Sequence, residues 1–363
     1  MKAIIAVPAV TGLLYRVWAR KSLTPLGTVF AAFTATAHAA HPWFAPFVLM
    51  AVFYFGGTKA TKVKHDVKAR LTLSAAGTVG EESPRNHLQV LANSLVGSVL
   101  SVAHTVVLAK TVGDAGDCFS LGQRAADVLM VGIVANYAAV AADTFSSELG
   151  ILAKSKPRLI TSLTLRQVPP GTNGGVTAMG LAAGLLGSFS VAGTSALVLP
   201  FCAGTTIKDR ALWTVAMTTC GVLGSLLDSV LGGLLQASVV DKRSGKIVEG
   251  IGGRKVLIHP ASIRPCGPLD DAAYFGQASG SAHLRNTETI ANAATLHGSH
   301  ITHTSAGSQP GRTHEEVKES RRIEVGRDWL DNNGVNMLMA ATMSFGAMGV
   351  AQWVWGVDVR ELL

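Results

Sequence analysis

The chain has 363 residues, of which 48% are hydrophobic and only 15% are charged. This composition excludes an ordinary soluble domain and indicates an integral membrane protein. The net charge is +8, but the basic residues cluster between apolar runs rather than interleaving with aromatic residues, so we expect membrane lipids and no nucleic acid as partners.

Apolar segments of a length that can cross a bilayer follow one another along the chain. The first could also be the core of a signal peptide, but Arg16 and Arg20 follow it, so we expect a span. The sequence therefore predicts an all-α fold, a polytopic bundle of about eight transmembrane helices, or seven without the first, in one domain over residues 1–363. The segments lie near residues 3–17, 23–40, 42–57, 88–109, 125–142, 175–202, 211–237 and 334–356.

Most of the 31 Lys and Arg residues lie in alternate connections between these segments. The four basic connections are Arg16–Lys21, Lys59–Arg85, Lys154–Arg166 and Lys242–Arg327. By the positive-inside rule they face the cytoplasm, and both termini face away from it. We expect an intracellular membrane, such as that of the endoplasmic reticulum.

Two features are expected to have no chemical role. Residues 250–326 are rich in Ser, His, Gly and Thr, and we expect a long, disordered cytoplasmic insertion there, whose histidines lack metal-site spacing. The cysteines form no Cys-x-x-Cys pair, so we expect buried or idle thiols rather than disulfides. They are Cys118, Cys202, Cys220 and Cys266.

Carboxylates within apolar segments are costly and call for a partner or a water-filled cavity. In the seventh segment Gly221, Ser225 and Asp228 share one small, polar helical face, so Asp228 is predicted to face protein. The fifth segment ends with Asp143 and Glu148, which point about 140° apart on an unbroken helix. They are either solvated residues at a helix end or part of a magnesium platform.

A Gly-rich turn, Val168–Gly175, leads directly into the sixth segment. Backbone N–H groups of such a turn, at the positive end of a helix dipole, can bind an anion. With Lys154 and Arg158 upstream, the turn is predicted to bind phosphate, through Thr172, Asn173, Gly174 and Gly175.

Two further segments place polar groups at the same membrane face. Arg85 and Asn93 precede and begin the fourth segment, and Asp331, Asn332, Asn333 and Asn336 begin the eighth. Asp331 could simply be the N-cap of its helix. Asn336 lies one turn deeper than a cap requires, which indicates a functional role.

Together these motifs resemble a membrane family that includes plant phytyl-phosphate kinase and the animal transmembrane protein 19. The similarity spans nearly the whole chain outside the insertion and is strongest at 143–150, 157–161, 168–176, 224–229 and 330–336. A looser likeness links the chain to dolichol kinase and phosphatidate cytidylyltransferase, which use CTP.

The resemblance implies a kinase that phosphorylates a polyprenyl or phytyl monophosphate to the diphosphate with a nucleoside triphosphate, CTP being expected. We expect Mg²⁺ as the cofactor, and nucleotide and prenyl-phosphate lipid as partners. The expected metal ligands are Asp143, Asp228 and Asp331, with Glu148 as a further catalytic carboxylate. The expected nucleotide and phosphate contacts are Arg85, Asn93, Lys154, Arg158, Thr172, Asn173, Gly174, Gly175, Ser225, Asn332, Asn333 and Asn336.

Three other functions remain open on the sequence. The chain could phosphorylate an isoprenoid alcohol, in which case one carboxylate would act as a base. It could transfer a cytidylyl group, or it could transport a lipid or solute without chemistry. The sequence does not indicate an oligomeric state.

Overall fold

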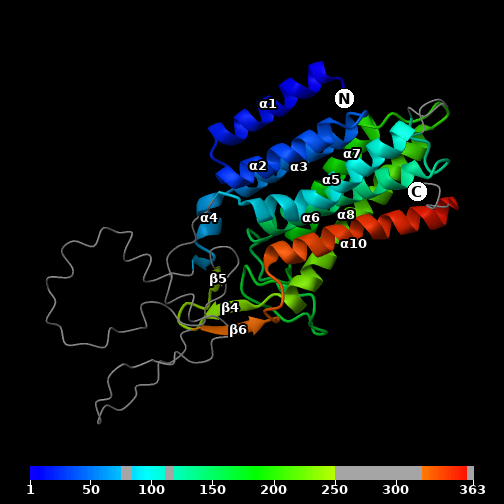
Figure 1. Cartoon of the computed structure of the whole chain (residues 1–363). Coiled ribbons are helices and arrows are strands. Elements are labelled where there is room, and N and C mark those ends of the chain that lie inside the picture. Colours follow the sequence, from blue (N-terminus) through cyan, green and yellow to red (C-terminus); the bar gives the residue numbers. More distant parts are fainter. Residues whose placement is uncertain (75–83, 111–117, 250–320, 358–363) are drawn as a thin grey trace, which may run out of the picture.

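The computed structural model describes residues 1–74, 84–110, 118–249 and 321–357. In these residues every predicted span is a helix, and one short helix, α4 (His65–Ala69), lies between two of them. Figure 1 shows the long helices side by side as one bundle. They are α1 (Ala3–Ala19), α2 (Pro25–Ala39), α3 (Ala45–Lys62), α5 (His87–Lys110), α6 (Ala126–Gly150), α7 (Ala178–Val198), α8 (Ile207–Leu235) and α10 (Asn332–Trp355).

Five of these helices, α5, α6, α7, α8 and α10, are long and apolar enough to cross a membrane. The prediction of a polytopic helical membrane protein is therefore confirmed. Helix α1 is a shorter apolar helix, so the exact number of spans stays a prediction.

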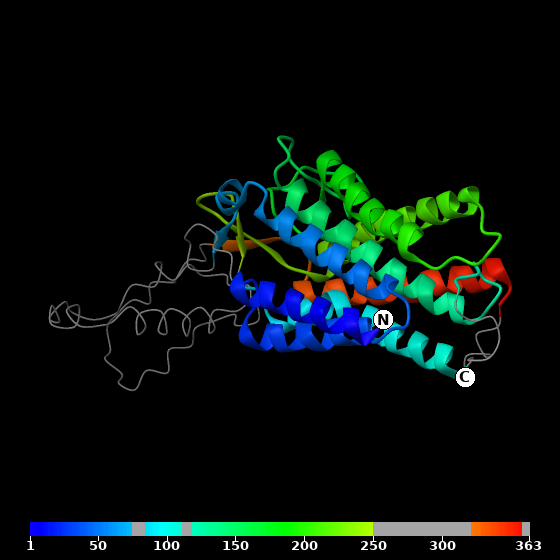
Figure 2. The ribbon, with the colours of Figure 1, turned by 90° about the horizontal axis from the view of Figure 1, so that it is seen from above.

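Helix α6 forms the core of the bundle, since its residues from Ala126 to Ala142 are all buried. Figure 2 shows α1 and α2 on one side of the bundle and α7 and α8 on the other. A Cβ atom at Gly187 of α7 would lie 2.6 Å from the carbonyl oxygen of Ala141, and one at Gly221 of α8 would lie 2.7 Å from that of Ala138. Small residues thus let α7 and α8 approach the backbone of α6 closely.

A small sheet lies at the end of the bundle opposite the start of α1 and the end of α10 (Figure 1). Its strands are β1 (Leu73–Ser74), β5 (Ile247–Glu249), β4 (Ser238–Asp241) and β6 (Arg321–Val325), in that order, with β1 and β5 parallel and the other pairs antiparallel. Two further short strands, β2 (Arg158–Leu159) and β3 (Gly175–Val176), pair antiparallel. The helical fold therefore includes strands that the apolar pattern did not predict.

The predicted insertion, residues 250–326, extends too far. Its last residues, Arg321–Val325, form β6, in which Ile323 pairs with Val239 of the buried strand β4. This pairing depends on a strand from a distant part of the chain, which local composition does not reveal. Residues 250–320 lie outside the described residues, so the prediction of disorder is not tested there.

The prediction of idle thiols is wrong for two cysteines. Cys118 and Cys202 form a disulfide, with the sulfur atoms 2.02 Å apart, although they are 84 residues apart in sequence. They meet because the segment before α6 pairs with the segment after α7, where the Phe119 N–H donates to the Pro200 carbonyl oxygen at 2.7 Å. Cys220 is a free, half-buried thiol, and Cys266 lies outside the described residues.

Candidate active site

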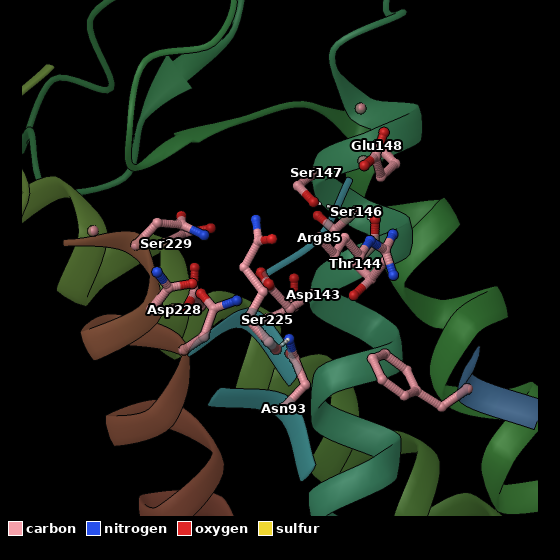
Figure 3. Close-up of a pocket in the computed structure, with 18 of the residues that line it drawn as sticks. Arg85, Asn93, Asp143, Thr144, Ser146, Ser147, Glu148, Ser225, Asp228 and Ser229 are labelled. Atoms are coloured by element: carbon pink, nitrogen blue, oxygen red, sulfur yellow. Dashed lines mark hydrogen bonds between the residues drawn. The ribbon is translucent and has the colours of Figure 1, made fainter. Parts of the chain in front are cut away.

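A cavity of about 440 Å³ opens among the helix ends that lie toward the small sheet. Figure 3 shows its central side chains pointing toward one another from α5, α6 and α8. The structure brings most of the predicted site residues into its lining, although they come from five separate stretches of the sequence. These are Arg85, Asn93, Asp143, Glu148, Thr172, Asn173, Gly174, Gly175, Ser225, Asp228, Asn332, Asn333 and Asn336.

Asp143 of α6 and Asp228 of α8 both line the cavity, and Figure 3 shows their side chains near one another at its centre. The Asn336 amide nitrogen, oriented to satisfy both of its polar atoms, donates to Asp228 Oδ1 at 3.2 Å and to the Asn332 carbonyl oxygen at 2.9 Å. Two neighbouring carboxylates repel each other unless they share a proton or a cation. The centre of the cavity therefore favours a bound positive charge.

Helix α6 continues unbroken to Gly150, so Glu148 points away from the direction of Asp143. Its Oε2 atom accepts a hydrogen bond from Lys68 Nζ at 2.6 Å, and its Oε1 atom accepts one from Thr61 Oγ1 at 3.2 Å. Lys68 is only 11% exposed, so the ion pair is largely shielded from water. Glu148 lines the cavity as a neutralised carboxylate, which distinguishes it from Asp143 and Asp228.

The Gly-rich turn lines the cavity beside α8. Gly174 has φ +78°, and its carbonyl oxygen accepts from the Ile160 N–H at 2.9 Å. The Asn173 N–H donates to Ser238 Oγ at 2.9 Å and the Gly175 N–H donates to the Thr172 carbonyl oxygen at 3.0 Å. These two backbone donors are therefore already used within the protein, and the predicted row of N–H groups is less available to phosphate than expected.

The predicted phosphate-binding cations are not all at the cavity. Lys154 and Arg158 are exposed and do not line it, and Arg158 Nη1 donates to the Leu165 carbonyl oxygen at 3.3 Å. Among the described residues that line the cavity, Arg85 is the only Lys or Arg. Its Nη2 atom donates to Thr61 Oγ1 at 2.8 Å, which fixes the guanidinium beside the cavity.

Asp331 is also absent from the lining. Its Oδ1 atom accepts from the Gly334 N–H at 2.8 Å, so it caps α10, as the sequence left open. The cap orients the first turn of α10 so that Asn332, Asn333 and Asn336 line the cavity. Within the described parts of the chain, no group of three or more His, Cys, Asp or Glu side chains is arranged to hold a metal ion.

Sequence reasoning missed Thr61 and Lys68, which fix Arg85 and Glu148. It assigned no role to Ser146, Ser229 or Gln236, which also line the cavity. Ser146 and Ser229 lie within 143–150 and 224–229, where the family resemblance is strong, and this position was an available signal. Lys68 lies in a basic connection with no motif around it, so nothing local distinguished it from its neighbours.

Comparison with known proteins decides the family. The family described as Integral membrane protein DUF92 matches residues 8–344. The chain belongs to this family. The resemblance predicted from the motifs is thereby confirmed.

Relatives of this chain occur in plants and archaea. It is 35% identical to Protein PGR of Arabidopsis thaliana over 68% of this chain and 83% of that protein. It is 33% identical to Protein VTE6, chloroplastic, of the same plant, over 41% of this chain and 39% of that protein. An uncharacterized membrane protein of Methanocaldococcus jannaschii is 38% identical over 30% of this chain and 40% of its own length. No solved structure matches the chain.

Proposed function

We propose that this chain is a membrane-embedded kinase that transfers a phosphoryl group from a nucleoside triphosphate, with CTP as the first candidate, to a polyprenyl monophosphate. The observation that supports it most is the convergence of Asp143, Asp228, Asn336 and Arg85 on one cavity at the basic end of an apolar bundle. The motif resemblance to the family of plant phytyl-phosphate kinase supports the same reaction.

The residues present fit Mg²⁺, the proposed cofactor. Mg²⁺ binds through one or two carboxylates together with substrate phosphates, and the neighbouring carboxylates of Asp143 and Asp228 in the cavity offer such a set. When bound there, the ion would neutralise charge on the phosphate oxygens. Asp331, which caps α10, is removed from the proposed ligands.

The other side chains of the cavity position the reactants. Arg85 binds oxygens of a phosphate by charge-assisted hydrogen bonds, and the Asn332 and Asn333 amides add neutral donors, whereas the Asn336 amide holds Asp228 in place. The acceptor phosphate has a second pKa of about 6, so at neutral pH it is mostly dianionic and needs no strong base. One of its oxygens attacks the γ-phosphorus, the bond to the β-phosphate oxygen breaks, and a nucleoside diphosphate leaves.

We also propose that the cavity faces the cytoplasm, where nucleoside triphosphates are available. The basic connections lie at the cavity end of the helices. The Cys118–Cys202 disulfide joins connections at the other helix ends, and disulfides persist in oxidising compartments. A membrane that separates the cytosol from an oxidising lumen, such as that of the endoplasmic reticulum, fits both features.

Turnover by purified protein tests the proposal. With γ-labelled CTP, Mg²⁺ and geranylgeranyl phosphate, we expect labelled diphosphate lipid and CDP. Asp143→Asn and Asp228→Asn should each lower turnover by about 10³-fold, because each removes charge without bulk. Asp331→Asn should retain most activity, since Asn is as good a helix cap as Asp.

The products also separate this reaction from the alternatives. Cytidine incorporated into lipid would replace the kinase with a cytidylyltransferase, and phosphorylation of geranylgeraniol alone would make it an alcohol kinase. No magnesium-dependent turnover with either lipid would favour a transporter. Full activity of Asp143→Asn or Asp228→Asn would remove that residue from the proposed metal site.

A further inference from the structure

One side of the cavity is apolar, and none of the predicted motifs contributes to it. This wall comes from α1, α2, α3 and the start of α5, whereas the polar side comes from α6, the Gly-rich turn, α8 and α10. On α1, Leu13, Leu14 and Val17 share one inward face, while Tyr15 and Trp18 on the same helix are exposed. The other apolar wall residues are Leu23, Ala31, Met50, Phe53 and Val90.

Arg85 is fixed where the apolar wall meets the polar side. Its backbone N–H donates to the Ser22 carbonyl oxygen at 3.2 Å, and its carbonyl oxygen accepts from the Thr24 N–H at 3.0 Å. These bonds hold Arg85 against the connection between α1 and α2, beside Leu23 of the apolar wall. The position of the charge is therefore set by the same segment that builds the apolar wall.

The charge of Arg85 remains available to a ligand. Thr61 lies between Arg85 and Glu148, since its hydroxyl accepts from Arg85 Nη2 at 2.8 Å and donates to Glu148 Oε1 at 3.2 Å. Lys68 already neutralises Glu148 through a contact of 2.6 Å. The carboxylate that Thr61 links to Arg85 is thus compensated, and Arg85 can pair with an anion in the cavity.

Figure 3 shows Asp143 between Arg85 on one side and Asp228 on the other. Asn336 donates to Asp228, and the Gly-rich turn packs through Gly174 against α8, the helix that carries Asp228. The cavity therefore has one anion-binding position next to an apolar wall and a second, amide-rich position across the central carboxylates.

We propose that these two positions are separate acceptor and donor subsites. The lipid acceptor lies with its chain along Leu14, Ala31 and Phe53 and its phosphate on Arg85. The nucleoside triphosphate lies on the side of Asp228, the Gly-rich turn and the α10 asparagines. The assignment rests on the proposed function and adds to it which residues recognise which substrate.

The size of the cavity has a further consequence for the acceptor. About 440 Å³ lies in the lower part of the range of about 300–1,000 Å³ in which a site holds one drug-sized ligand. The cavity is too small for a nucleotide and an entire long isoprenoid. Only the first isoprenoid units contact the wall, and the rest of the chain extends into the bilayer.

The test compares Michaelis constants for each substrate in matched variants. Ala31→Phe fills the apolar wall, and Val29→Phe places the same side chain on the exposed face of α2, where Val29 is 49% exposed. Arg85→Gln removes the proposed phosphate contact, and Arg20→Gln removes an exposed cation near the same end of the bundle. The acceptors are geranylgeranyl phosphate and the short-chain dimethylallyl phosphate.

Ala31→Phe should raise KM for geranylgeranyl phosphate about tenfold, as expected for loss of about 1.4 kcal/mol of binding. The rise should be smaller for dimethylallyl phosphate, whose single isoprenoid unit contacts less of the wall, and KM for CTP should not change. Arg85→Gln should raise KM for both acceptors by about 10- to 100-fold and leave KM for CTP unchanged, because a charge-assisted hydrogen bond is lost. Arg85→Lys should restore part of the loss. Both control variants should match the wild type.

A rise in KM for CTP but not for the acceptors in Arg85→Gln would overturn the assignment.

Binding without turnover separates this inference from the kinase proposal. Geranylgeranyl phosphate alone, without nucleotide, should raise the Tm of the purified wild type, and this shift should be lost in Arg85→Gln and reduced in Ala31→Phe. If the shift behaves so but no lipid is phosphorylated, the kinase proposal fails and the lipid subsite stands. If turnover occurs and neither variant changes acceptor binding, the subsite assignment alone fails, and if there is neither binding nor turnover, both fail.

Discussion

Asp143 and Asp228 meet because the residues around them are small. A Cβ atom at Gly224 would lie 2.6 Å from the Cβ atom of Ala139, so α8 can approach α6 only where a side chain is missing. The same holds for the Gly-rich turn, in which a Cβ atom at Gly174 would lie 2.8 Å from Gly233 Cα and 2.9 Å from the Ser229 carbonyl oxygen. At the scale of single residues, the site depends as much on absent side chains as on charged ones.

Gly174→Ala should therefore lower activity strongly. The new methyl group must push the turn away from α8, and φ +78° adds strain of about 1–3 kcal/mol for a non-Gly residue. Turnover and the Tm of the purified variant are the measurements. Gly204→Ala is the matched control, because Gly204 has φ +99° but no atom within 4 Å of the added methyl group. It should lose stability with little effect on turnover, and equal turnover in both variants would show that the contact with α8 is unimportant.

The pair formed by Lys68 and Glu148 gives a second prediction at this scale. Lys68→Met should leave Glu148 as a poorly solvated, unpaired carboxylate that competes for Arg85 through Thr61. We expect a lower Tm and a higher KM for the lipid acceptor. The double variant Lys68→Met with Glu148→Gln should recover most of the wild-type Tm and KM, with a coupling free energy of about 1–3 kcal/mol in a double-mutant cycle. Additive effects of the two changes would show that the pair has no such role.

At the scale of elements, the small sheet brings together the two chain segments that flank residues 250–320. Strand β5 ends at Glu249 and β6 begins at Arg321, and both pair with β4, where Val239 faces Val248 on one side and Ile323 on the other. β4 is buried along its whole length, and Arg321 is buried opposite Asp241. The two ends of the insertion are thus held by paired strands beside the end of α8.

Deleting residues 262–320 should leave turnover within about twofold of the wild type, because β5, β4 and β6 remain. A deletion that continues through Val325 should lower the yield of monodisperse protein and turnover together. The longer deletion removes β6, which pairs with β4 on one side, and exposes the buried side chain of Asp241. Size-exclusion profiles and turnover provide the measurements. A well-folded but inactive product of the shorter deletion would show that the insertion itself takes part in the reaction.

At the scale of the whole molecule, the two ends of the bundle differ chemically. One end has the basic connections, the small sheet and the cavity, and the other has the start of α1, the end of α10 and the disulfide. This polarity follows from the alternation of the helices, since each successive helix reverses direction. For the proposed function, it would provide an aqueous face for nucleotide and an apolar interior for a lipid chain in a single cavity.

Side-specific labelling checks the orientation. The background for this test has Cys220 and Cys266 replaced by Ala. Lys156→Cys and Lys208→Cys then each introduce one thiol at an exposed site. Lys156 lies near the cavity, and Lys208 lies in the first turn of α8 at the other end of the bundle. In sealed vesicles with the cytoplasmic face outward, an impermeant maleimide should label Lys156→Cys directly. Lys208→Cys should react only after the membrane is opened with detergent. The reverse pattern would place the cavity on the side without nucleotide and contradict the kinase proposal.

The apolar pattern of the sequence was enough to predict every long helix of the bundle, because hydrophobic runs of this length have few alternatives to a buried helix. Helical periodicity also placed Asp228 on a protein-facing side, together with Ser225. Several motifs were predicted to share a membrane face, and the alternation of helix direction brings them there.

Only the tertiary structure decided which side chains meet. It paired Glu148 with Lys68, placed Arg158 outside the cavity, used Asp331 as a helix cap and joined Cys118 to Cys202. Local patterns report on the burial and direction of a side chain, whereas these contacts depend on the packing of segments that are distant in sequence. The sequence thus determined the helices and the end of the bundle at which the polar groups gather, and packing of small residues between α6, α7 and α8 decided how those groups form a site.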